Sequence, residues 1–315
     1  MPPTSATRVA PAIPGLARLR PLLGEINDTK RIRTADHPAS LAHLAFGRSW
    51  RLLLAGRDPA EVALLEMARA LIAARLGGVD AATLAGAGLE TAEIRAIFEA
   101  AIDTLADRMG PEILGPIRAS AAALAADPVS FIDANVPDFV GKLGRQPRAG
   151  ATRPGHARLI LEPPEDHAEH CQVTAVHGVL VALLSGADPA VPFLAGLSHH
   201  FHNAYLPDSG FAGEELLGPH LGPIMARFTA RALAQLPPFL ARQVEEARKV
   251  LGHADTPEAR AFHAADVLDR VLQMDHYAQV AAFELRQALD DLELVHAGPL
   301  QAYQNAVLAD AGLVG

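Results

Sequence analysis

Apolar residues recur every three or four positions over long stretches of this chain, which is the period of an α-helix buried on one face. One such stretch has apolar side chains at Ile94, Ile97, Phe98, Ala101 and Leu105. The two-residue alternation of half-buried strands is nearly absent, and β-branched and aromatic residues are scarce beside alanine and leucine. The pattern therefore predicts an all-α fold.

Helix start and stop signals divide the first half of the chain. A helix is predicted to begin at Asp58-Pro59, which supplies an N-cap and a proline at the first helical position, and to end before Gly77. Similar start signals occur at residues 36–40 and 91–93. We expect ordinary core helices at these positions.

A loop over residues 144–155, rich in glycine, proline and arginine, is the best candidate for a domain boundary. It divides the chain into an N-terminal helical region, residues 1–150, of unknown role and a second helical region, residues 151–315. The first 23 residues contain five prolines and no clear amphipathic period, so we expect a disordered or loosely packed arm there.

A cluster of histidines marks the second region. Seven of the 14 histidines fall between His167 and His220. Neutral imidazole is the commonest protein ligand for transition metals, which favours a metal site. Three helices are predicted around this cluster, at about residues 168–185, 190–205 and 257–289.

The candidate metal ligands come from these three helices, as in the metal sites of helical bundles. They are His170, His199, His200 and Asp266. A second group of side chains could orient a substrate or exchange protons with it. His167 and His202 belong to this group.

Composition and charge narrow the range of possible functions. The chain has 315 residues, 50% of them hydrophobic, and a net charge of −9, so it is globular. Residues 151–315 hold 10 Lys and Arg against 20 Asp and Glu, which argues against nucleic acid and for a small-molecule substrate. We expect no membrane span. The single cysteine fits a reducing, cytoplasmic compartment, and the alanine-rich surface is compatible with a homodimer.

Four short motifs resemble the HD-domain superfamily of metal-dependent hydrolases, in particular its small nucleoside-monophosphate phosphatases. They are Ala-Glu-His170-Cys, Leu-Ser-His199-His200-Phe-His-Asn203-Ala, Pro207-Asp208 and His-Ala-Ala-Asp266-Val-Leu-Asp-Arg-Val-Leu-Gln. The resemblance covers about residues 160–290 and implies an HD-domain-like helical bundle preceded by an additional helical region.

The resemblance also assigns roles by position. It places His170 at the first metal histidine, His199 at the histidine of the His-Asp pair, Asp266 at the terminal aspartate and Asp208 at a second acid. Two positions depart from the family pattern. His200 stands in place of the paired aspartate, and Asn203 in place of an acid that in the phosphatases helps to activate or protonate. The resemblance thus adds Asp208 and Asn203 to the candidate catalytic residues.

These departures change the expected chemistry. With Asp266 as the only anionic ligand, Mg²⁺ is disfavoured and one Fe, Mn, Co, Ni or Zn ion per chain is expected. Three functions stay open: a metal-dependent hydrolase of a small phosphorylated or otherwise anionic metabolite, an iron-dependent oxygenase of the HD-domain type, and a catalytically silent HD-fold binding module. The hydrolase is the first choice because of the resemblance.

Two further charged positions are interpreted as structural. Asp269 is expected to pair with Arg270 or Arg286 rather than to contact the site. The segment Lys30-Arg31-Ile32-Arg33 is expected to be a solvated turn.

Overall fold

The computed structural model describes residues 13–126, 135–280, 284–291 and 293–314. Within these residues the chain forms fourteen α-helices and no strand, and β-pairing is limited to three isolated bridges. The predicted all-α fold is confirmed.

The helices fall on either side of the loop that starts at residue 144. Those before it are α1 (Leu16–Asp28), α2 (Leu41–Leu54), α3 (Pro59–Leu76), α4 (Ala81–Gly86), α5 (Thr91–Asp103), α6 (Pro111–Ala126) and α7 (Asp138–Leu143). Those after it are α8 (His167–Ser185), α9 (Ala190–Ser198), α10 (Gly210–Leu217), α11 (Leu221–Leu233), α12 (Pro238–Ala247), α13 (Pro257–Val280) and α14 (Gln301–Asp310). Short 3₁₀ segments lie at Ala106–Arg108, Phe201–Ala204, Gly218–His220 and Arg248–Gly252, and a π-helical turn at Gln287–Asp291.

The capping signals read from the sequence act as expected. The Asp58 side chain accepts hydrogen bonds from the backbone N–H groups of Ala60 and Glu61 at the start of α3. Gly77 ends that helix with a left-handed backbone (φ 62°), a conformation that glycine adopts without steric cost. These local signals therefore fix both ends of α3.

The N-terminal arm differs from its prediction where the structure describes it. Helix α1 begins at Leu16, and Leu16, Leu19 and Leu23 are fully buried. Apolar residues every three or four positions outweigh the helix-breaking effect of Pro21, which lies inside the helix. Residues 1–12 lie outside the described part of the chain.

Two helices of the second region are shorter than predicted. Helix α9 ends at Ser198, because His200 leaves the helical backbone conformation (φ −97°, ψ 22°) and a 3₁₀ turn follows. Helix α13 ends at Val280 instead of residue 289. The next three residues lie outside the described range.

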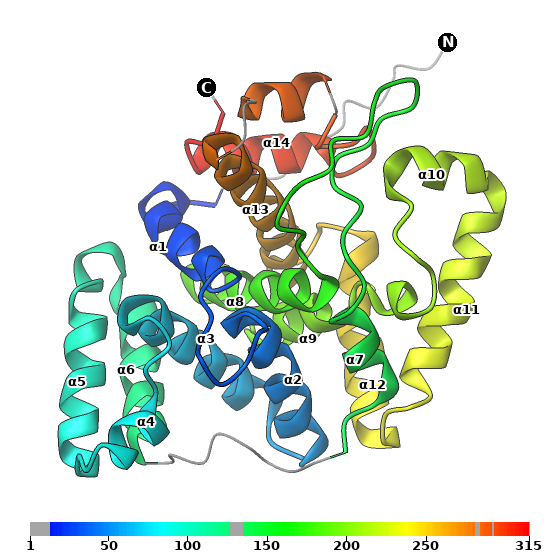
Figure 1. The fold of residues 1–315 in the computed structure, drawn as a ribbon. Helices are drawn as coiled ribbons and strands as arrows, with labels where there is room; N and C mark the ends of the chain where they lie inside the picture. Colours follow the sequence, from blue (N-terminus) through cyan, green and yellow to red (C-terminus); the bar gives the residue numbers. More distant parts are fainter. Residues whose placement is uncertain (1–12, 127–134, 281–283, 292, 315) are drawn as a thin grey trace.

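Helix α8 is the centre of the fold (Figure 1), with α2 and α3 on one side and α13 on the other. Helix α9 crosses it closely: a Cβ atom on Gly196 would lie 2.6 Å from the Cα of Ala175. This close approach brings the end of α9, where His199 and His200 lie, against the first turns of α8. One hydrophobic cluster joins buried residues from Ile13 to Leu313 and so includes both regions.

The loop between α7 and α8 folds back on itself beside this centre (Figure 1), through bridges between Pro147 and Asp166 and between Ala151 and Leu159. It carries Arg148 to the candidate site. None of the helices in the described residues combines the length and the apolar character that crossing a bilayer requires.

Candidate metal centre

His170 is the most firmly held of the candidate ligands. It lies fully buried in the first turns of α8, and its Nδ1 is 2.6 Å from Oδ2 of Asp269, a fully buried carboxylate on α13. Asp269 can only accept a hydrogen bond, so Nδ1 carries the proton and donates it. The Nε2 atom of His170 is left with a lone pair.

His199 shows the same arrangement. Its Nδ1 lies 2.7 Å from the carbonyl oxygen of Gly196 and therefore donates, leaving a lone pair on Nε2. The two Nε2 atoms of His170 and His199 are 3.1 Å apart. Two lone pairs at this distance repel each other unless a proton or a metal cation lies between them.

Asp266 completes this group from α13. Its Oδ1 lies 3.4 Å from Nε2 of His170 and 3.8 Å from Nε2 of His199. The structure thus brings together three side chains from α8, the end of α9 and α13, as the sequence predicted, with the three facing atoms no more than 3.8 Å apart. Outward Nδ1–H donors and inward Nε2 lone pairs are the usual arrangement of metal-binding histidines.

His200 lies beside these residues but is already engaged. Its Nδ1–H donates to Oδ1 of Asn203 at 2.8 Å, and its Nε2 accepts from Nη1 of Arg148 at 3.0 Å. The ligand nitrogens of His170, His199 and His200 lie within 4.8 Å of one another, so these residues could hold a metal ion. His200 would join such a site only after releasing Arg148.

His167 and Asp208 form the neighbouring part of the site. The Nδ1–H of His167 donates to the carbonyl oxygen of Gln146 at 2.9 Å, and its buried Nε2 has no hydrogen-bond partner in the described structure. That Nε2 is 3.6 Å from Oδ2 of Asp208, which accepts a hydrogen bond from the backbone N–H of Ala149. Both facing atoms are acceptors, and a water molecule could donate to both.

His202 is buried but makes no contact with the converging lone pairs. Its ring centre is 5.7 Å from that of His200. Burial, with help from the nearby charge of Arg248, lowers the pKa of His202 to about 4. The Asn203 side chain orients His200 by accepting its Nδ1–H. The roles that the sequence suggested for His202 and Asn203 toward a substrate stay predictions.

The site favours the protonation states that a metal needs. Burial, followed by neighbouring histidines, holds the pKa of His199 and of His200 well below the usual range. Burial alone would raise the pKa of Asp266, but Arg270 and His170 lower it well below its ordinary value. Burial likewise opposes ionisation of Asp208, but Arg148 and His167 lower its pKa overall. Neutral imidazoles and ionised carboxylates are both metal-binding forms.

Lys30 and Asp269 are the residues whose roles the sequence analysis missed. Nζ of Lys30 lies 2.7 and 2.8 Å from the two carboxylate oxygens of Asp269 and also pairs with Glu165. The expected pairing of Asp269 with Arg270 or Arg286 is wrong, and the expected solvated turn at Lys30 is wrong for that residue, whose side chain is 2% exposed. Burial lowers the pKa of Lys30, but its two carboxylate partners raise it above the ordinary value.

The contact of Asp269 with His170 could have been predicted from the sequence. Asp266 and Asp269 are three residues apart, so they share a helix face, and both could have been expected to point toward His170. The contact of Lys30 had no signal in the sequence, because no local pattern connects the turn after α1 with α13.

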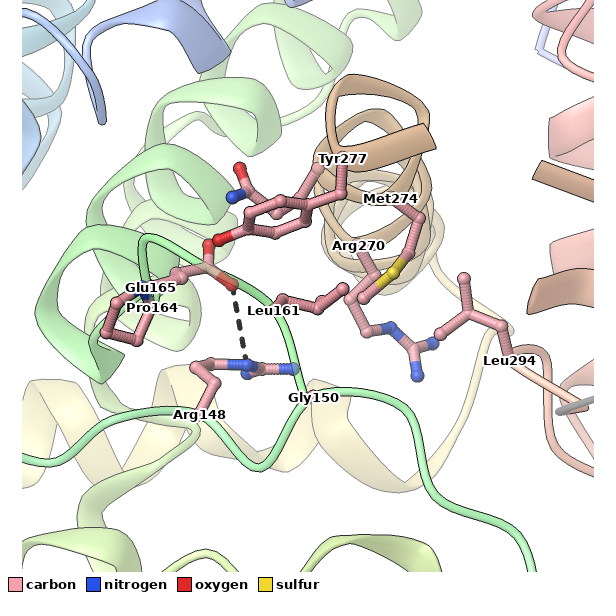
Figure 2. A pocket seen from close by; sticks show the side chains of 10 residues that line it. Arg148, Gly150, Leu161, Pro164, Glu165, Arg270, Met274, Tyr277 and Leu294 are labelled. Carbon is pink, nitrogen blue, oxygen red and sulfur yellow. Dashed lines mark ion pairs between the residues drawn. The ribbon is translucent and has the colours of Figure 1, made fainter. Parts of the chain in front are cut away.

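Figure 2 shows a small cavity of ≈ 50 Å³, and Arg148 and Arg270 in its wall contact His200 and Asp266, respectively. Arg148 lines it from the loop and Arg270 from α13, together with Glu165, Gln273 and Tyr277. Nη2 of Arg270 lies 3.6 Å from Oδ2 of Asp266, and Nε of Arg148 3.6 Å from Oε2 of Glu165. The cavity is large enough for only a few atoms, and the two guanidinium groups favour an anion.

No family model, curated protein or solved structure matches this chain. The resemblance of residues 160–290 to HD-domain hydrolases stays a prediction, since a helical fold by itself does not identify that family.

Proposed function

We propose that this protein is a metal-dependent hydrolase of a small anionic metabolite and that it binds one divalent transition metal through His170, His199 and Asp266. The observation that carries the proposal is the pair of facing Nε2 lone pairs, 3.1 Å apart, next to the Asp266 carboxylate. A buried arrangement of acceptors alone is costly and is best explained by a cation. Imidazole-rich sites favour Zn, Fe, Ni or Co over Mg²⁺.

When bound, such a metal acts as a Lewis acid that lowers the pKa of a coordinated water from about 15.7 toward about 7. The chain's own residues supply the remaining functions. Arg270 and Arg148 would bind the anionic group of the substrate in the adjoining cavity. His167 Nε2 and Asp208 Oδ2, 3.6 Å apart and both acceptors, would orient the attacking water, and Asp208, whose lowered pKa keeps it ionised at neutral pH, would accept its proton.

An iron-dependent oxygenase is a second candidate. Two histidines and one carboxylate with further positions open are the ligand set of many non-haem iron oxygenases, and His170, His199 and Asp266 match it in kind. The two guanidinium groups and the Asp208 carboxylate favour the hydrolase, because they provide for an anionic substrate and for a base.

Elemental analysis combined with activity assays tests the proposal. The purified protein is stripped with a chelator, reloaded separately with Zn²⁺, Mn²⁺, Co²⁺, Ni²⁺ and Fe²⁺, and assayed for phosphate release from p-nitrophenyl phosphate and from nucleoside monophosphates. We expect one metal per chain and phosphate release that chelation abolishes. Exchanging His170, His199 or Asp266 for alanine should remove the metal, whereas His220→Gln, an exposed control, should retain it.

The alternatives give different results in the same assays. Oxygen consumption with Fe²⁺ and no phosphate release would favour the oxygenase. Failure to bind any of the five metals would contradict the proposal and favour a binding module without catalysis. Two metals per chain held by these residues would contradict the single-metal arrangement.

A further inference from the structure

A second cavity lies on the other side of α8, away from the histidines. It has a volume of ≈ 480 Å³ and lies among α2, α3, α4 and α8 in the N-terminal region. Gln172, Val173 and Val176 line it from α8, and Val176, nine residues after His167, points to the opposite side of that helix from His167. The volume is within the range of small-molecule binding sites.

The middle of this cavity is apolar. Small side chains on the facing helices leave the space open, and larger apolar side chains complete its walls. The small residues are Ala42, Ala45, Ala70 and Ala73, and the larger ones include Leu41, Ile72, Phe98, Leu124, Val173 and Val176. Leu41 and Arg51, which both line the cavity from α2, are ten residues apart, or about 15 Å along a helix.

Positive charge collects at one end. Arg48, Arg51 and Arg69 line this end together with Glu66, a fully buried carboxylate. Arg48 binds Glu66 through two hydrogen bonds of 2.8 and 2.7 Å, and Nε of Arg69 lies 3.6 Å from it. Arg48 and Arg51 carry two positive charges against the single negative charge of Glu66, so this end of the cavity is positive.

Acidic side chains lie at the opposite end. A Cβ atom on Gly78 would lie 3.2 Å from side-chain atoms of both Leu41 and Thr34, which places that end of the cavity beside the first turn of α2. Asp36 and Asp80 line the cavity close to these residues. The cavity is therefore polarised along its length.

Gln172 gives an independent indication that the cavity binds a ligand. Its side chain lines the cavity and the residue is 2% exposed, so the group is almost fully buried. Its Oε1 accepts a hydrogen bond from the hydroxyl of Ser49 at 3.0 Å, but its buried Nε2 has no partner in the described structure. A buried amide donor without an acceptor is costly, and an acceptor on a bound molecule would satisfy it.

We propose that this cavity binds one amphiphilic molecule, with an apolar chain between α2 and α3 and a carboxylate at the end formed by Arg48, Arg51 and Gln172. Glu66 occupies the guanidinium fork of Arg48, so Arg51 and the unpartnered Nε2 of Gln172 are the donors left for a ligand, and they match the two oxygens of one carboxylate. The site is separate from the metal centre. It gives the N-terminal region a binding function that does not depend on the proposed hydrolase activity.

Isothermal titration of the full chain with decanoate, and with decan-1-ol and decyl phosphate as matched probes, tests this site. We expect saturable binding of one decanoate per chain and binding of decan-1-ol at least ~10-fold weaker, as loss of a charge-assisted hydrogen bond predicts. Decyl phosphate binding as tightly as decanoate would contradict the choice of carboxylate.

Variants locate the ligand in the cavity. Arg51→Gln and Gln172→Leu should each weaken decanoate binding by ~10-fold and leave decan-1-ol unaffected. Ala45→Phe should abolish binding of both probes by filling the space. Arg95→Gln, an arginine exchange on α5, and the metal content of every variant serve as controls for folding. Equal affinity for decanoate and decan-1-ol, unchanged binding by Arg51→Gln and Gln172→Leu, or no saturable binding would overturn the proposal.

Discussion

The two faces of α8 differ in what they pack against: one borders a hydrogen-bonded polar cluster, and the other borders an apolar cavity. On the histidine face, hydrogen bonds between side chains hold the imidazole rings in place: Asp269 holds His170, Lys30 holds Asp269, and Asn203 holds His200. On the other face, Gln172 and Val176 border an apolar cavity of ≈ 480 Å³ with a charged end. The first face leaves space for an ion and a few atoms, and the second leaves space for a whole small molecule.

This difference predicts how each face responds to change. A tightly paired polar cluster loses much stability when one partner is removed, because the remaining charges stay buried without compensation. An apolar cavity tolerates and can even gain from added atoms, since the space is already present. Substitutions on the two faces should therefore change the free energy of unfolding by different amounts and in opposite directions.

The largest effect is expected at Lys30. Lys30→Met leaves the carboxylates of Asp269 and Glu165 buried without their shared cation, and we expect a loss of about 3–5 kcal/mol in the free energy of unfolding. Urea denaturation measures it. Lys142→Met breaks a partly exposed pair with Asp138 and should cost less than about 1 kcal/mol. A Lys30→Met protein as stable as the Lys142→Met control would mean that the cluster is not held by this cation.

The pH dependence of stability should reveal a second buried group on the same face. Burial lowers the pKa of His177 to about 4, against about 6.5 for an unfolded chain. Between these values the unfolded chain binds a proton that the folded protein does not. The unfolding free energy therefore falls as the pH decreases from 6.5 to 4, by about 3 kcal/mol for this residue, and this contribution is fully present above pH 6.5.

His177→Gln removes this titration and keeps a donor for the carbonyl oxygen of Leu23, which now accepts from Nε2 of His177. Urea unfolding of metal-free protein at pH 7 and pH 4 should show a smaller pH-dependent loss in the variant than in the wild type. The exposed exchange His156→Gln gives the baseline. Equal losses in all three proteins would show that His177 is not held neutral.

Asn203 tests whether His200 takes part in metal binding. Asn203→Leu removes the acceptor of the His200 Nδ1–H, and loss of such an orienting partner typically lowers metal affinity by about 10–100-fold. Competition with a fluorescent chelator measures the affinity. An unchanged affinity would remove His200 from the ligand set and leave His170, His199 and Asp266 alone.

The parts of this molecule that the sequence predicted are those encoded locally. The N-cap of α3 at Asp58 and its end at Gly77 depend on neighbouring residues, as does the burial of α8 along most of its length. The convergence of His170, His199 and Asp266 was predicted because the spacing of their motifs matched a known arrangement. Their roles as metal ligands stay a prediction.

The missed features depend on contacts between distant parts of the chain. Lys30 and Asp269 are 239 residues apart, and no local pattern pairs them. The hydrogen bond from Arg148 to His200 arises only because the loop 144–166 folds back over the site. The cavity between α2 and α3 arises from alanines, which are helix formers everywhere in this chain and signal a void only once the packing of the helices is known.

The smallest expected effects compare the same exchange on the two faces. Ala45 lines the cavity, so Ala45→Leu should fill empty space and raise the free energy of unfolding by about 0.5–2 kcal/mol. Ala175 is fully buried where α9 crosses α8, 2.6 Å from the position of a Cβ on Gly196, so Ala175→Leu should overpack this crossing and cost about 1–3 kcal/mol. Ala92→Leu on the exposed surface of α5 should change stability by less than about 0.5 kcal/mol. Thermal and urea unfolding of the three variants give the signs, and a destabilised Ala45→Leu protein would mean that the cavity is not available for an apolar group.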